Sequence, residues 1–121
     1  HQFIFIGGHV NHHMQTTHGP FFDSMMKAFN IDTMFLSGDA FDFKKGLSNA
    51  DEVTVSIINA VRPQAHQCIV LVDESKVSKC ATFQCLSPKY IDVVITDYMA
   101  SEDDIDYLSK VQCHFEYVKT K

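Results

Sequence analysis

The chain has 121 residues, 45% of them hydrophobic and 21% charged, with a formal net charge of −5. This length suits one domain, and the ordinary balance of apolar and charged residues excludes wholesale disorder. The acidic excess argues against a broad nucleic-acid-binding face, because gripping a phosphate backbone needs concentrated positive charge. No apolar run approaches the roughly 18 residues that a membrane helix requires.

The chain begins at His1 and enters an apolar run almost at once. It shows no starting Met, basic leader or cleavage site, which indicates neither a signal peptide nor a natural start. We therefore expect residues 1–121 to form a single, partial domain. The cysteines have no C-x-x-C spacing, which favours reduced thiols in a cytoplasmic protein. They are Cys68, Cys80, Cys85 and Cys113.

Four apolar runs of strand length recur along the chain without polar alternation. Such runs are typical of parallel strands covered on both faces. A fifth run alternates and indicates a partly exposed edge strand. The four runs are residues 3–6, 33–36, 68–72 and 93–95, and the alternating one is 114–118.

Helical patterns lie between these runs. Apolar residues at 21, 22, 25, 26 and 29 form one stripe, and Pro20 suits the first turn of that helix. Asn49 followed by Glu52 resembles a capping box, opening a second helix that ends before Pro63.

Ser101 with Asp104 opens a third helix in the same way. Residues 77–87 are expected to form a loop with at most one short helix, and residues 9–17 an extended or irregular segment. Strands that alternate with helices predict an α/β fold, with a mostly parallel sheet flanked by helices.

Small and acidic residues follow the strand runs, at the carboxyl ends where open α/β sheets bind ligands. Glycines let a ligand approach the backbone, and carboxylates accept hydrogen bonds from hydroxyls. Lysines at 44, 45, 76 and 79 lie just beyond two of these ends. A small hydroxylated anion such as a sugar phosphate suits this mixture, although glycine and aspartate also simply end strands and begin turns. The end residues are Gly7, Gly8, Gly38, Asp39, Asp73, Thr96 and Asp97.

Other chemistries have weaker support. His9 and His13 have the spacing of two metal ligands on a helix, but their segment has no helical stripe, so we expect no metal site. There is no G-x-S-x-G elbow for a nucleophile. There is also no Walker loop or G-x-G-x-x-G for a nucleotide, and we expect no cofactor.

Three segments in order carry a family resemblance. Gly7-Gly8 precedes His18-Gly19-Pro20 and a helix, and residues 35–42 then lead into Gly46-Leu47. A D-x-S-K motif at 73–76 precedes the run 91–97, which ends in Ile-Thr-Asp. In this order and separation, the segments resemble the C-terminal effector-binding domain of DeoR-type bacterial transcriptional regulators.

The resemblance implies a fold of the sugar-phosphate isomerase and CoA-transferase superfamily, and a sensor that responds to phosphorylated sugars. Such regulators bind operator DNA through an N-terminal helix-turn-helix, and their sensor begins with a strand and a Gly-Thr-Thr-type phosphate loop. Neither part matches this chain, which we therefore expect to be truncated. The family also implies a cytoplasmic homo-oligomer, here a repressor of sugar-metabolism genes, with no membrane partner.

The resemblance carries over to specific positions. Asp39 and Asp42 match an acidic pair expected to accept hydrogen bonds from sugar hydroxyls. Asp73 and Lys76 match the D-x-S-K motif, in which the lysine charge would face the phosphate. The paired glycines match residues 7 and 8, and Gly38 completes the expected ligand-binding set.

Two other functions compete with the sensor. A sugar-phosphate isomerase of the related fold also uses carboxylates and a lysine near these strand ends. The loop 39–47 has no glutamate placed as a general base, and Glu52 is assigned to helix capping, so we favour a sensor without catalytic residues. A purely structural interaction domain is the third possibility, and it predicts no anion at the strand ends.

Overall fold

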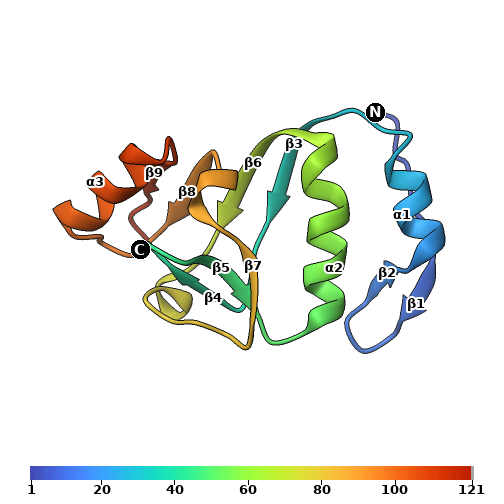
Figure 1. The fold of residues 1–121 in the computed structure, drawn as a ribbon, viewed down its shortest axis with the longest axis horizontal. Coiled ribbons are helices and arrows are strands. Elements are labelled where there is room, and N and C mark those ends of the chain that lie inside the picture. Colours follow the sequence, from blue (N-terminus) through green and yellow to red (C-terminus); the bar gives the residue numbers. More distant parts are fainter. Residues whose placement is uncertain (121) are drawn as a thin grey trace.

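A four-stranded parallel sheet forms the centre of the molecule (Figure 1). The computed structural model describes residues 1–120. The strand order is β3-β6-β8-β9, and each neighbouring pair is parallel. This confirms the α/β class and the mostly parallel sheet. The strands are β3 (Ile31–Leu36), β6 (Ala65–Leu71), β8 (Val93–Thr96) and β9 (His114–Tyr117).

Three of the four predicted buried runs and the edge strand are confirmed, but the strand expected at residues 3–6 is wrong. Residues 3–6 form no strand, and Phe3 and Phe5 are 88% and 71% exposed. An apolar run becomes a strand only where a neighbouring strand supplies ladder hydrogen bonds. No such neighbour flanks this run within residues 1–120.

The sheet is covered on one face, not on both as the continuous apolar runs predicted. Met34, Cys68, Val70 and Val94 point to the covered face and are at most 8% exposed. Phe35, in register with Ile69 on the other face, is 65% exposed. Residues that alternate along a strand lie on opposite faces, so an unbroken apolar run reports the composition of both faces but not what covers each.

Three α-helices are found in the described part of the chain, all at predicted places. α1 ends at Met26, before the last residue of its apolar stripe, Phe29, and Phe21 in its first turn is 71% exposed. α3 begins as predicted, with Ser101 Oγ accepting a hydrogen bond from Asp104 N. The helices are α1 (Pro20–Met26), α2 (Glu52–Val61) and α3 (Glu102–Lys110).

The capping box expected at Asn49 is wrong. Asp51 caps α2 instead, and its carboxylate accepts hydrogen bonds from both N and Oγ1 of Thr54. These bonds, led by the one from the Thr54 backbone, hold the pKa of Asp51 below its usual range. Asn49 is the last residue of β5, where its Oδ1 accepts a hydrogen bond from Asp39 N.

A second, antiparallel sheet of order β4-β5-β7 was not predicted. Its third strand falls where a loop was expected, because β7 has too few residues to show a period. Gly46 lies at φ +89°, and a Cβ there would lie 2.0 Å from Leu86 O, so only glycine fits this approach of β5 to β7. The strands are β4 (Ala40–Asp42), β5 (Gly46–Asn49) and β7 (Phe83–Leu86).

The segment expected to be extended or irregular forms a small hairpin, β1 (His9–Asn11) and β2 (Thr16–His18). Figure 1 shows this hairpin and α1 on the far side of α2 from the antiparallel sheet. The N-terminal residues therefore form a peripheral unit, whose α1 contacts α2.

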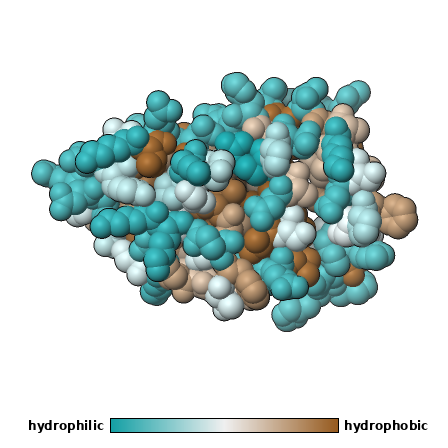
Figure 2. Space-filling view, viewed as in Figure 1, coloured by the Kyte–Doolittle hydropathy of each residue, from teal (hydrophilic) through white to brown (hydrophobic). Residues whose placement is uncertain are grey.

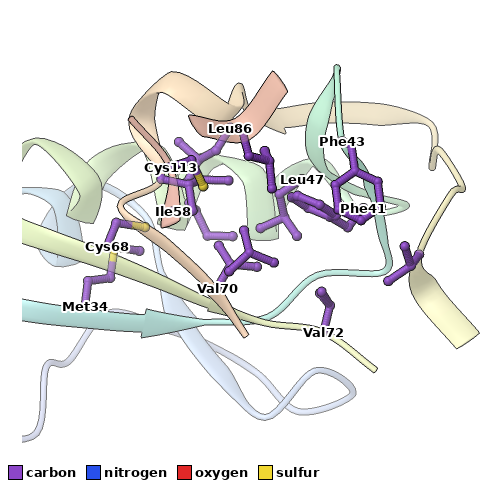
Figure 3. Packing of buried hydrophobic residues seen from close by; sticks show 14 of the residues in the cluster. Met34, Phe41, Phe43, Leu47, Ile58, Cys68, Val70, Val72, Leu86 and Cys113 are labelled. Atoms are coloured by element: carbon purple, nitrogen blue, oxygen red, sulfur yellow. The ribbon is translucent and has the colours of Figure 1, made fainter. Parts of the chain in front are cut away.

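One core joins the two sheets (Figure 3). Phe41 and Leu47 of the β4–β5 hairpin are fully buried, as are Val70 of β6 and Leu108 of α3. Figure 3 shows Phe41 and Leu47 extending from the hairpin toward Val70. The antiparallel sheet is thereby held over the covered face of the parallel sheet, close to the carboxyl ends of its strands.

The surface in the same view is polar at its left end, where α3 lies (Figure 2). Acidic residues in the first turn of this helix suit the positive end of its dipole. No described helix is long and apolar enough to cross a membrane.

We expect the four free thiols to react unequally. Cys80 is exposed, whereas burial raises the pKa of Cys68 to about 11 and that of Cys113 to about 12. Because the thiolate is the reactive form, titration of the folded chain at pH 8 with an aromatic disulfide reagent should modify Cys80 first. A Cys80→Ser variant should lose this fast phase, and equal rates for all four thiols would contradict the buried positions.

The same shifts give a pH dependence. A thiol whose pKa is raised on folding stabilises the folded chain below its unfolded pKa, ordinarily 9.0, and this contribution is lost as the pH rises through the folded value. The free energy of unfolding measured in urea should therefore fall between about pH 9 and 11. A Cys68→Ala variant should show a shallower fall, and an equally steep one would exclude Cys68 as a source.

Candidate functional site

The carboxyl ends of three neighbouring parallel strands bring four polar side chains together. Ser37 follows β3, Asp73 follows β6 after one residue, and Asp97 follows β8. Lys76 ends the short 3-10 helix η2 (Glu74–Lys76). We call Ser37, Asp73, Lys76 and Asp97 the carboxyl-edge cluster.

Contacts across strands connect the cluster. Lys76 Nζ donates to Ser37 Oγ at 3.4 Å and lies 3.8 Å from Asp73 Oδ2. Glu74 N donates to Asp97 Oδ1 at 2.7 Å. The loop after β6 is therefore fastened to the ends of both neighbouring strands.

Asp73 shapes the turn that carries Lys76. Its Oδ1 accepts hydrogen bonds from N and Oγ of Ser75, the first at 2.9 Å. The Ser75 hydroxyl is the main cause that holds the pKa of Asp73 below its usual range. The carboxylate consequently stays ionised at neutral pH, with Lys76 as its counter-ion.

The Asp73–Lys76 ion pair is open to solvent. The side chains are 52% and 35% exposed, so the pair contributes little to stability. Lys76 can therefore turn toward an anionic ligand at small cost, while Asp73 and Ser37 supply hydrogen-bonding oxygens beside it. This arrangement can bind an anion that also carries hydroxyls.

Asp39 lies two residues beyond Ser37 and is exposed. Its Oδ2 accepts a hydrogen bond from Ala50 N at 2.8 Å, which holds the loop before α2. Gly38 before it is buried, and a Cβ there would lie 2.6 Å from Leu47 Cδ1. Glycine at 38 is therefore explained by its packing against β5.

Asp42 has a structural role in the β4–β5 turn. Its Oδ1 accepts hydrogen bonds from the backbone N of Lys44 at 2.9 Å and of Lys45 at 2.8 Å. β4 also contacts the segment after η2, through a bridge between Phe41 and Val77. Asp42 thus lies on the hairpin beside the cluster, with one carboxylate oxygen committed to the turn.

The paired glycines are not brought to the cluster. Figure 1 shows the N-terminal segment on the far side of α2 from the loop that contains η2. Gly8 lies at φ +154°, where a Cβ would be 2.6 Å from His18 O and 3.2 Å from Phe22 Cβ. Packing against α1 and β2 accounts for the glycine at this position.

Two members of the cluster, Ser37 and Asp97, were not among the predicted ligand-binding residues. Asp97 was recognised as a strand end and as part of the Ile-Thr-Asp match, but no role was inferred for it. Ser37 follows its strand directly and lies within the segment 35–42 of the family resemblance, but no role was inferred for it. No sequence pattern predicts the hydrogen bond from Glu74 N to Asp97 or the one from Lys76 Nζ to Ser37.

Hollows on the surface are shallow near the cluster. A depression of about 330 Å³ lies over the ends of β6 and β8 and includes Asp73, Asp97 and Thr120 in its lining. A larger hollow of about 650 Å³ lies between the β1–β2 hairpin and α2, with Val10, His12 and Ile57 in its lining. Among residues 1–120, no group of three metal-ligating side chains comes together.

A family model for the DeoR C terminal sensor domain matches residues 1–98. The chain belongs to this family. Its parallel α/β sheet agrees with the sugar-phosphate isomerase-like fold expected for a DeoR sensor domain.

Curated relatives of this DeoR sensor domain are transcriptional regulators. A putative aga operon transcriptional repressor of Escherichia coli O157:H7 is 25% identical over 109 residues, which are 90% of this chain and 40% of the relative. The transcriptional repressor AccR of Agrobacterium fabrum is 25% identical over 93 residues, 76% of this chain and 36% of AccR. An uncharacterized HTH-type transcriptional regulator of Haemophilus influenzae is 28% identical over 91 residues, 75% of this chain and 35% of the relative. The chain therefore spans two fifths or less of these proteins.

Proposed function

We propose that this DeoR sensor domain binds a phosphorylated sugar at the carboxyl-edge cluster and serves a transcriptional repressor of sugar metabolism. The observation that carries the proposal is the placement of Lys76, whose ammonium lies between Ser37 and Asp73 at the ends of two parallel strands. The family and the names of its relatives support a regulator.

The cluster, together with Asp39 two residues beyond Ser37, offers each kind of group that a sugar phosphate needs. Lys76 supplies a point charge to the phosphate. Asp39 and Asp73, both exposed, offer carboxylate oxygens to sugar hydroxyls. Gly38 and Asp42 shape the loops around the cluster, and the predicted contribution of Gly7 and Gly8 would require the N-terminal segment to move.

Regulation follows from linkage. A sugar phosphate that binds one arrangement of the regulator more tightly than another shifts its affinity for operator DNA, typically 5–150-fold for a coupling of about 1–3 kcal/mol. In this proposal the DNA is contacted by a separate helix-turn-helix part of a cytoplasmic homo-oligomer. This chain contributes the ligand site and no chemical step.

Isothermal titration with a panel of phosphosugars tests the proposal. The panel is ribose 5-phosphate, glucose 6-phosphate and fructose 6-phosphate, each paired with its unphosphorylated sugar and with inorganic phosphate. We expect saturable binding of at least one sugar phosphate, tighter than that of its parent sugar and of phosphate alone. Binding of none, or conversion of an aldose phosphate to its ketose during the titration, would contradict the sensor function.

A further inference from the structure

Asp97 occupies a junction at the carboxyl edge of the sheet. It follows β8 directly and is half-buried. Its Oδ1 accepts the 2.7 Å hydrogen bond from Glu74 N, and its Oδ2 accepts one from Thr120 Oγ1 at 3.4 Å. The end of the central strand β8 is thus tied both to η2 and to the segment after β9.

The bond to Glu74 anchors the short turn that carries Lys76. Within the turn, Asp73 accepts hydrogen bonds from Ser75 N through its carboxylate and from Lys76 N through its carbonyl. These bonds give the turn its shape but attach it only to its own strand, β6. The Asp97–Glu74 bond attaches it to the neighbouring strand and so fixes its tilt over the edge of the sheet.

We infer that Asp97 is a positioning residue of the ligand site, which holds Glu74 so that Lys76 presents its ammonium toward Ser37 and the bound anion. The inference rests on the proposed function for the ligand, but the positioning belongs to the free chain. Asp97 itself need not touch the ligand. Asp97 influences the position of Lys76 because Lys76 lies only two residues after Glu74, whose backbone amide Asp97 holds.

Loss of this bond should leave the fold intact. Glu74 is exposed, so its N–H can bond to water when the carboxylate is removed. The internal bonds from Asp73 would still form the turn, and only its attachment to β8 would be lost. The expected consequence is a wider range of Lys76 positions and a weaker hold on the phosphate.

The test compares three variants of the whole chain. Asp97→Ala removes the acceptor, whereas Asp97→Asn keeps an Oδ1 acceptor and removes the charge. Asp106→Ala removes an exposed carboxylate in the middle of α3 and serves as the control with the same change in charge. Each is titrated with the tightest-binding phosphosugar of the panel, and exchange of the Glu74 amide proton is measured by NMR without ligand.

Asp97→Ala should weaken binding about fivefold, the scale of one hydrogen bond, and should speed exchange of the Glu74 amide. Asp97→Asn and Asp106→Ala should stay within about twofold of the unaltered chain in both measurements. Unchanged binding in Asp97→Ala would overturn the inference, and so would equal losses in Asp97→Ala and Asp97→Asn. If the unaltered chain binds no phosphosugar, the proposed function is wrong, but the positioning role can still be tested by amide exchange. Unchanged exchange of the Glu74 amide in Asp97→Ala would then overturn the positioning role as well.

Discussion

Phe41→Ala is expected to lower the free energy of unfolding by about 3–5 kcal/mol, because it removes a large side chain from a site that cannot refill. Phe41 is 0% exposed and packs edge-on against Phe43, with ring centroids 5.5 Å apart. It also belongs to the β4–β5 hairpin, whose burial joins the two sheets. Urea unfolding followed by circular dichroism measures the change.

Phe35→Ala is the matched control for this measurement. It makes the same substitution on the open face of the parallel sheet, where the side chain is 65% exposed. We expect a change within about 0.5 kcal/mol, as for most surface substitutions. Equal destabilisation by Phe35→Ala and Phe41→Ala would show that the described core is not where the folding energy lies.

Lys76→Met should weaken sugar-phosphate binding by about 10- to 150-fold, the range set by losing a hydrogen bond to a charged group. Methionine keeps an unbranched apolar stem but removes the ammonium that faces Ser37 and Asp73. The fold should be unaffected, because the ion pair that is lost is exposed. Titration calorimetry with the tightest-binding panel member measures the affinity.

Lys89→Met provides the control for charge alone. Lys89 lies over the ring of Tyr90, in the turn before β8 and away from the strand ends. Its replacement lowers the net charge by the same amount and should leave the affinity within about twofold. If Lys76→Met binds as tightly as Lys89→Met, the ligand does not use Lys76.

The parallel sheet was predictable because its apolar runs belong to strands that pair with each other over one shared core. Residues 33–36, 68–72 and 93–95 pair with each other, so their apolar runs report a real shared environment. Residues 3–6 are equally apolar but have no pairing partner among the described residues. Composition alone does not distinguish an apolar run that pairs in a sheet from one that does not. The antiparallel strands escaped prediction because they are three or four residues long, and Asp42, Gly46 and Asn49 resemble turn residues.

The candidate site was predictable in part, through the rule that strand ends meet at one edge. Asp73 and Lys76 lie there together, and Asp39 lies close along the chain to Ser37. Gly7 and Gly8 were expected at this edge on two grounds, the prediction of residues 3–6 as a strand of the same sheet and the match to the paired glycines of the family, and residues 3–6 form no strand. The roles of Ser37 and Asp97 depend on contacts between distant segments, which no local pattern encodes.

Chemical-shift mapping on the ¹⁵N-labelled chain tests the central claim most directly. During titration with the tightest-binding phosphosugar, the account predicts that amide shifts concentrate at residues 37–39, 73–76 and 96–98, and that they vanish in Lys76→Met. Shifts confined to residues 1–18, or spread without relation to the strand ends, would contradict a ligand site at the carboxyl edge of the sheet.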